Sequence, residues 1–236
     1  MIRLLFILVI WVTEQGAYCQ SSQNLLSGKA WVIKDVNLKK DRGWHTVVDI
    51  MDIMDFENDS LLVVKKIGVR ELKSYRYKVD QKGRLKINNG SQYQLKSLSD
   101  SSLALTDGSS VFIYTALRDT KSVISIDSAV KSILSNIWSY DSLGAEKRIE
   151  FSEDRFLVGE FDTGLQRFTE TSIANGSEKY QGGWTIESYK DALLFTIFPS
   201  TSYRKTTYQV EKITDNYIKT VGWQDGLKTI IKLYKL

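Results

Sequence analysis

The feature that most constrains the fold is an eleven-residue pattern that occurs twice, at Met54–Val64 and at Ile149–Gly159. Each copy reads apolar, acid, Phe, then a polar stretch that contains Asp, then an apolar run. The two copies are 95 residues apart. Apolar segments on either side of a short polar turn are typical of a β-hairpin. We therefore expect two hairpins, and with them two copies of one all-β fold.

Other aromatic residues line up between the two halves in the same order. Trp31 and Trp138 are 107 residues apart, as are Tyr77 and Trp184, and Tyr93 precedes Tyr208 by 115 residues. Short alternating segments between turns about 8–12 residues apart predict an antiparallel sandwich or barrel. We expect each half to form one small antiparallel barrel.

Two segments of the second half are predicted to differ from strands. Asp127–Leu134 is the best helix candidate, with Asp127 as its N-cap and three apolar residues on one face. It is interpreted as the entry helix of the second barrel. Asp162–Gly183 is predicted to be a polar insertion, and its final Gly182-Gly183 pair a turn that leads into the next strand.

The first 19 residues are predicted to be a signal peptide. Arg3 precedes an apolar run of nine residues, Leu4–Val12, which is too short to span a bilayer. Cleavage is expected after Cys19, and the alternative is a lipoprotein in which Cys19 is acylated. The predicted domains are then 20–118 and 119–236. Because Cys19 is the only cysteine, the mature chain would have no disulfide, which suits a Gram-negative periplasm or cell surface.

These motifs together resemble the bacterial lipocalin-like domains found in exported proteins, especially of Bacteroidetes. The resemblance rests on the opening that ends in Trp31 or Trp138, the Phe-x-x-Asp pattern, the Tyr77-Lys78-Val79 strand and the Ser-rich Ser99–Leu105 strand. It covers nearly all of Leu25–Leu236 as two tandem copies. It implies two tandem antiparallel β-barrels, each with a short entry helix, and binding of a small hydrophobic or amphipathic ligand.

The aromatic residues that recur in both halves are the candidate ligand-binding residues, although packing inside the barrels is the role we favour for them. An eight-stranded barrel is just wide enough to be filled by its own side chains or to hold one small ligand. The candidates are Trp31, Phe56, Tyr77, Tyr93, Trp138, Phe151, Trp184 and Tyr208.

Charge is distributed unevenly between the halves. Residues 20–118 carry 16 Lys and Arg against 11 Asp and Glu, a net charge of +5, whereas residues 119–236 carry 15 against 16, a net charge of −1. We interpret the basic excess as the solvated face of alternating strands; the alternative is a patch for anionic polymers or lipid head groups. Its residues are Lys65, Lys66, Arg70, Lys73, Arg76, Lys78, Lys82, Arg84 and Lys86.

Catalytic and metal-binding motifs are not evident. His45 is the only histidine and is interpreted as a surface residue. The acidic series at 49, 52, 55, 57 and 59 lacks the spacing of a calcium loop. Glu150, Glu153 and Asp154 could serve a hydrolase only if the fold brought carboxylates together. We predict no enzyme activity, no metal and no cofactor.

The sequence therefore predicts an exported, non-enzymatic binding protein of the bacterial envelope, not transmembrane after signal cleavage and without a nucleic-acid partner. The alternative is an interaction module with filled barrels, whose inserted loops (Lys39–Met51 and Asp162–Gly183) bind an envelope protein or glycan. A hydrolase that uses loop carboxylates is a further alternative.

Overall fold

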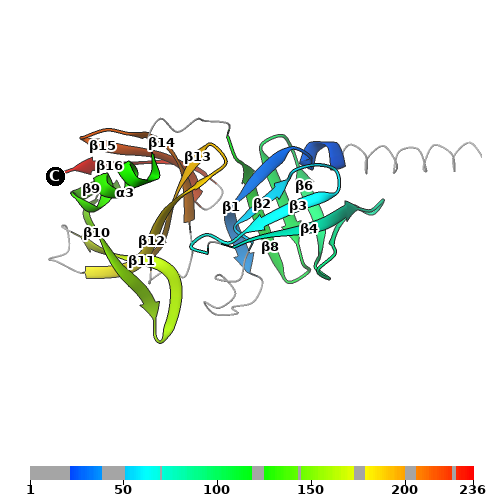
Figure 1. Ribbon diagram of the computed structural model, residues 1–236, viewed down its shortest axis with the longest axis horizontal. Helices are drawn as coiled ribbons and strands as arrows, with labels where there is room; N and C mark the ends of the chain where they lie inside the picture. The colour runs from blue at the N-terminus through cyan, green and yellow to red at the C-terminus, as the bar shows by residue number, and fades with distance from the viewer. Residues whose placement is uncertain are drawn as a thin grey trace, which may run out of the picture. The chain divides into compact units, whose positions relative to one another are not determined.

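The computed structural model describes residues 22–38, 51–69, 71–118, 125–142, 145–172, 179–199, 206–224 and 227–236. They form an all-β protein with two closed barrels of eight antiparallel strands, each preceded by a short helix (Figure 1). This confirms the predicted fold class. The domain limits 20–118 and 119–236 stay a prediction. The predicted signal peptide, including Cys19, lies outside the described residues.

The first barrel follows a helical segment at residues 22–26, and each strand pairs with the next before β8 closes the barrel against β1. Its strands are β1 (Lys29–Leu38), β2 (Ile53–Phe56), β3 (Leu61–Lys65), β4 (Leu72–Val79), β5 (Arg84–Ile87), β6 (Gln92–Leu98), β7 (Ser102–Thr106) and β8 (Ser110–Ala116).

The second barrel follows helix α3 (Ile126–Leu134) and closes by pairing of β16 with β9. Its strands are β9 (Ile137–Ser142), β10 (Ala145–Val158), β11 (Phe161–Ser172), β12 (Lys179–Tyr189), β13 (Ala192–Pro199), β14 (Thr206–Ile213), β15 (Tyr217–Gln224) and β16 (Leu227–Lys235). Neither helical segment of the described chain is long and apolar enough to cross a lipid bilayer.

Helix α3 begins at Ile126, one residue before the predicted range, and its N-cap is Ser125 rather than Asp127. Ser125 has the extended backbone of an N-cap residue, and its hydroxyl accepts a hydrogen bond from the Ser128 N–H at 3.2 Å. Asp127 lies in the first turn, where its carboxylate faces the positive end of the helix dipole. Ala129 and Ile133 are buried against the barrel core.

The repeated pattern forms a hairpin in the first copy only. β2 and β3 pair around the turn at 57–60, as predicted. In the second copy the hairpin prediction is wrong, because Ile149–Val158 belongs to the single strand β10. Register shifts between Phe151 and Leu157 carry the strand past its polar residues without a turn. The chain reverses later, at Gly159, which has a φ of 61°.

The prediction of a polar insertion at Asp162–Gly183 is also wrong for the part of this segment that the structure describes. Residues 162–172 lie in β11 and residues 179–183 in β12, while 173–178 lie outside the described residues. Gly182 and Gly183 are interior positions of β12 rather than a turn. A Cβ on Gly182 would lie 2.5 Å from Phe168 Cε1, so glycine is needed there to make room for that ring.

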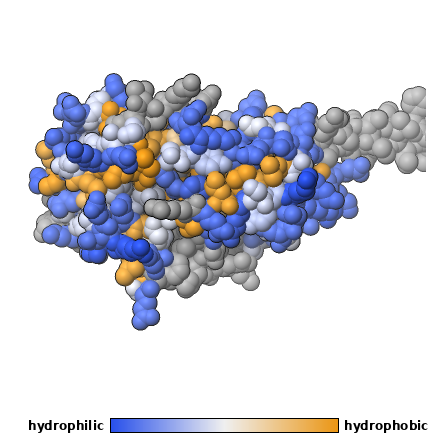
Figure 2. Space-filling model, in the orientation of Figure 1, coloured by the Kyte–Doolittle hydropathy of each residue, from blue (hydrophilic) through white to orange (hydrophobic). Residues whose placement is uncertain are grey.

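Alternation along the strands separates a buried interior from a mixed surface. In the second barrel α3 and the strands both contribute to a large buried cluster, and Phe156, Leu165 and Phe198 form a smaller one. The fully or nearly fully buried members of the large cluster are Ala129, Ile133, Trp138, Ile149, Phe151, Phe168, Trp184, Ile186, Leu193, Phe195, Tyr208, Val210, Ile218 and Leu233. Figure 2 shows mostly hydrophilic residues on the face in view, with apolar residues between them.

Candidate functional site

Trp31 and Trp138, two of the three predicted tryptophans, occupy equivalent positions in the two barrels. Trp31 in β1 lies opposite Met54, and Trp138 in β9 lies opposite Ile149. Met54 and Ile149 each precede the Phe of the repeated pattern by two residues. Both indole rings are fully buried. The equivalence therefore extends to strand register and places both tryptophans inside their barrels.

The two indoles differ in how their N–H groups are satisfied. Trp138 Nε1 donates a hydrogen bond to the Ile133 carbonyl at 3.0 Å, which ties β9 to the last turn of α3. Trp31 Nε1 has no hydrogen-bond partner among the described residues. A buried donor without a hydrogen bond is unfavourable. The described part of the first barrel therefore lacks, at Trp31, the stabilising hydrogen bond that the second barrel has at Trp138.

An aromatic pair stabilises the first barrel beside this tryptophan. Phe56 and Tyr77 are both buried and meet edge to face, with ring centroids 4.9 Å apart. The Tyr77 hydroxyl donates to the Asn58 carbonyl at 2.8 Å. Burial, and to a lesser extent Asp59, raises the pKa of Tyr77 well above its usual value. These contacts fix the β2–β3 turn onto β4.

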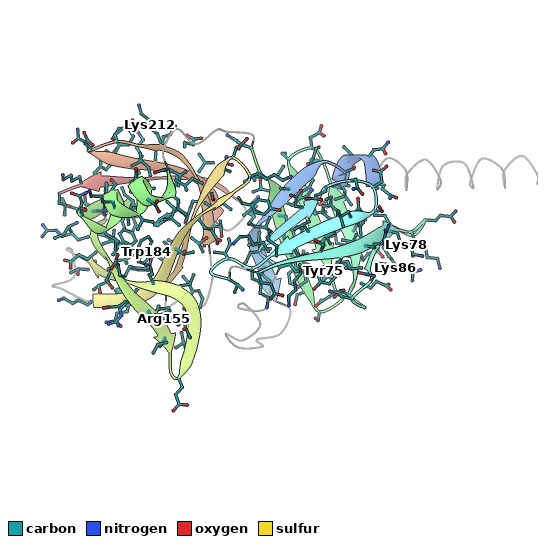
Figure 3. The ribbon with its side chains drawn as sticks, viewed as in Figure 1. Tyr75, Lys78, Lys86, Arg155, Trp184 and Lys212 are labelled. Atoms are coloured by element: carbon teal, nitrogen blue, oxygen red, sulfur yellow. The ribbon has the colours of Figure 1, made fainter. Side chains whose placement is uncertain are left out.

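The second barrel repeats this arrangement with different residues. Phe151 and Trp184 meet edge to face with centroids 5.1 Å apart. Trp184, which Figure 3 labels in β12, donates its indole N–H to the Ser152 carbonyl at 3.0 Å. In both barrels an aromatic side chain with a polar tip therefore bonds a carbonyl just after the Phe of the repeated pattern.

The last predicted pair is equivalent in sequence order but not in burial. Tyr93 in β6 is half-buried and packs edge to face on Phe112, with ring centroids 5.9 Å apart. Tyr208 in β14 is buried, and Gly222 of β15 leaves room for its ring. Burial raises the pKa of Tyr208 to about 12. Seven of the eight predicted residues are thus buried inside a barrel, and Tyr93 is the exception.

Four aromatic rings pack together inside the second barrel, next to helix α3. The Phe151 ring contacts those of Phe168, Trp184 and Phe195, with centroid separations of 6.2, 5.1 and 5.7 Å. We call these four residues the aromatic floor. Ile133 and Ala129 of α3 belong to the same buried cluster. This level of the barrel is therefore occupied by side chains.

A polar layer lies next to the aromatic floor, on the side away from α3. Tyr140 follows Trp138 by two residues in β9, and Lys147 lies directly opposite it in β10. Glu170 of β11 follows Phe168 by two residues. Lys147 Nζ is 2.6 Å from Glu170 Oε1, and the Tyr140 hydroxyl donates to the other oxygen, Oε2. We call these three residues the polar cluster.

The polar cluster is sheltered but not sealed from water. The side chains of Lys147 and Glu170 are 26% and 13% exposed. Burial is the main cause of the raised pKa of Tyr140, and Glu170 and Tyr208 raise it further. A sheltered lysine–carboxylate–phenol group offers donors and acceptors to a bound molecule at the edge of an apolar interior.

The polar cluster was not predicted from the sequence, although the sequence contains a signal for it. Lys147, Ile149 and Phe151 alternate along one strand, so a lysine occurs at the phase of the buried residues. Tyr140 has the same relation to Trp138. The partner Glu170 could not be assigned, because it lay in the segment predicted to be an insertion.

The equivalent layer of the first barrel has a different composition. Asp52, four residues before Phe56, is the counterpart of Lys147, four residues before Phe151. Asp52 is fully buried. The Tyr114 hydroxyl donates to the Met51 carbonyl at 3.1 Å, and burial, with Tyr93 and Asp52, raises the pKa of Tyr114 well above its usual value. The two barrels therefore place an acidic residue and a basic residue at equivalent internal positions.

The acidic residues weighed in the sequence do not form a common site among the described residues. Asp52 and Asp55 are buried, whereas Glu57 and Asp59 are exposed in the β2–β3 turn. Asp49 and His45 lie outside the described residues.

The three carboxylates of β10 considered for a hydrolase are exposed. They are Glu150, Glu153 and Asp154. The Asp154 carboxylate lies 3.6 Å from the Arg167 guanidinium.

Fold and site define a class of protein: a tandem pair of eight-stranded antiparallel β-barrels, with a polar layer inside the second barrel. Comparison with protein-family models and with curated proteins gives no match for the chain.

Proposed function

We propose that this protein is an exported, non-enzymatic, lipocalin-like binding protein whose second barrel holds a small amphipathic molecule in the bacterial envelope. The observation that supports the proposal is the polar cluster beside the aromatic floor, inside a closed barrel. Small-molecule sites combine mostly apolar walls with a few polar groups that orient the ligand. An apolar body would lie against the aromatic side chains, and a polar head would bond the cluster.

The charges of the polar cluster favour a ligand whose head group carries no net charge. Lys147 and Glu170 compensate one another at 2.6 Å. A charged head group would enter this sheltered layer without a partner of its own, which is unfavourable. Hydroxyl, amide or ester groups can instead bond the Lys147 ammonium protons and the Tyr140 oxygen. A neutral amphiphile such as a monoacylglycerol fits this chemistry.

The test is displacement of a neutral fluorescent probe, N-phenyl-1-naphthylamine, from the full chain by a long-chain monoacylglycerol. Tyr140→Phe removes one hydroxyl and keeps the ring, so we expect displacement to require about 3- to 10-fold more monoacylglycerol, the effect of one hydrogen bond. The matched control is Tyr217→Phe in β15, whose ring lies 5.9 Å from Lys212 Nζ and which is not part of the polar cluster. The control should behave as the wild type.

Two results would contradict the proposal. One is a probe that does not bind, or that monoacylglycerol does not displace. The other is an equal response of both variants, which would place the ligand away from Tyr140. Circular dichroism of both variants would establish that they are folded, so that a lost response reports on the site.

A second candidate is an interaction module with filled barrels that binds an envelope protein or glycan. The contacts that favour it are those of the aromatic floor, because one ring, Phe151, meets three others within 6.2 Å. Absence of displaceable probe, together with a folded protein, would favour this candidate.

A further inference from the structure

The outer face of the β4–β5 hairpin and its turn carries five cations. Tyr77, Val79, Leu85 and Ile87 are buried, so the residues that alternate with them face outwards. The outward cations are Arg76, Lys78, Arg84 and Lys86, and Lys82 is exposed in the turn. We call these five residues the basic face. Figure 3 shows Lys78 and Lys86 side by side on the first barrel, and Figure 2 colours this part of the surface mostly hydrophilic.

Two lysines of the basic face are direct cross-strand neighbours. Lys78 lies opposite Lys86 in the antiparallel register of β4 and β5. Side chains at such positions are about 5 Å apart at Cβ, and like charges there are destabilising. An ordinary solvated face of alternating strands does not require this placement, which concentrates charge instead of dispersing it.

Asp80 neutralises only part of the basic face. Its carboxylate lies 2.7 Å from Arg84 Nε and 3.1 Å from Lys86 Nζ, and it accepts hydrogen bonds from the Lys82 and Arg84 N–H groups. Burial opposes ionisation, but the hydrogen bonds from Arg84, Lys86 and Lys82 hold the pKa of Asp80 well below its usual value.

The other three cations of the basic face are not paired with a carboxylate of the described residues. Among the described residues, no carboxylate lies within ion-pair distance of Arg76, Lys78 or Lys82. The five cations of the basic face and the one carboxylate of Asp80 together have a net charge of +4.

We propose that the basic face is a docking surface for a membrane that contains anionic lipids. The face is presented by two paired strands and their turn, and its charge is complementary to head-group phosphates. Three of its five cations are lysines, whose compact ammonium groups act as point charges and suit phosphates that can move beneath them. A polyanion held in fixed register would instead favour arginine forks.

This site is separate from the one proposed for the amphipathic ligand. The basic face lies on the outside of the first barrel, and the polar cluster lies inside the second. Adsorption to anionic lipid would keep a carrier close to a membrane, but neither proposal requires the other.

The experiment is sedimentation of the full chain with phosphatidylcholine vesicles, with and without phosphatidylglycerol. We expect binding only to the vesicles with phosphatidylglycerol, and loss of binding at ~1 M salt, where the screening length is about 3 Å. The Lys78→Gln/Lys86→Gln variant should bind about 30-fold more weakly, the effect expected for two surface cations. The matched control is Lys179→Gln/Lys232→Gln, which removes two exposed lysines of the second barrel.

Three outcomes would overturn the proposal. The first is no preference for anionic vesicles. The second is an equal loss of binding in the test and control variants, which would indicate attraction by overall charge. The third is stronger binding to a soluble anionic polysaccharide or to nucleic acid, through the same two lysines, at equal charge concentration. Failure of the probe displacement in the second barrel would change none of these results.

Discussion

Two glycines within the strands of the second barrel make room for aromatic rings of its core. Gly182 leaves room for Phe168, and Gly222 leaves room for Tyr208. Neither residue has to be glycine for the sake of its backbone conformation, since neither has a positive φ. The glycines therefore act through the space that they leave for aromatic side chains.

Gly182→Ala is expected to lower the free energy of unfolding of the second barrel by about 2 to 3 kcal/mol, because an added methyl overpacks the core. The Cβ would lie 2.6 Å from the Phe198 carbonyl oxygen, which is backbone and cannot turn aside. Urea unfolding followed by tryptophan fluorescence would measure the change. Ser188→Ala, at an exposed position of the same strand, is the control and should be nearly neutral. Equal stability of the two variants would contradict this packing.

Because Tyr208 is buried, we expect the second barrel to lose stability at alkaline pH. Burial raises its pKa from 10.0 to about 12 in the folded protein, so ionisation favours the unfolded chain. The stabilisation is fully present below pH 10 and is lost as the pH rises to about 12, by about 2 to 3 kcal/mol. Urea unfolding at successive pH values would measure the slope. Tyr208→Phe should reduce the slope above pH 10; an unchanged slope would contradict the assignment.

Helix α3 packs against the core of the second barrel, and its N-cap stabilises the helix that makes this contact. Ser125→Ala removes the acceptor for the Ser128 N–H and should destabilise the second barrel by about 1 kcal/mol. Asp127→Asn should cost only a few tenths of that amount, because it weakens a dipole interaction at the surface. Thermal unfolding of the two variants would distinguish them. A larger effect at Asp127 would restore the cap predicted from sequence.

The elements that sequence predicted well are those in which local pattern and tertiary contact agree. Trp31 and Phe56 recur in the same order as Trp138 and Phe151, because the members of each pair occupy equivalent positions in the strand register. The hairpin prediction was wrong at β10, because a polar stretch can form either a turn or a bulge. Pairing with β11 decides between the two, and this pairing is not visible in the local sequence.

The polar cluster could not be predicted because its members come from three strands. Tyr140 and Glu170 are 30 residues apart. Their proximity depends on the registers of β9 with β10 and of β10 with β11, which no local pattern contains. Only the inward phases of Tyr140 and Lys147 were visible in the sequence.

The two barrels of the molecule share a framework but differ in one internal layer. The tryptophan and the Phe-centred aromatic pair are shared, whereas the adjacent layer holds Asp52 in the first barrel and Lys147 in the second. A shared framework with a changed internal layer is consistent with barrels that take different ligands, or with one that takes none.

Native mass spectrometry of the full chain would show whether the second barrel carries a small amphipathic molecule. The purified protein would be compared with the same sample after organic extraction, and Tyr140→Phe with Tyr217→Phe. We predict a bound mass of lipid size that extraction removes, that is reduced in Tyr140→Phe and that persists in Tyr217→Phe. A protein that carries no such mass, and that takes up no added monoacylglycerol after extraction, would contradict the account.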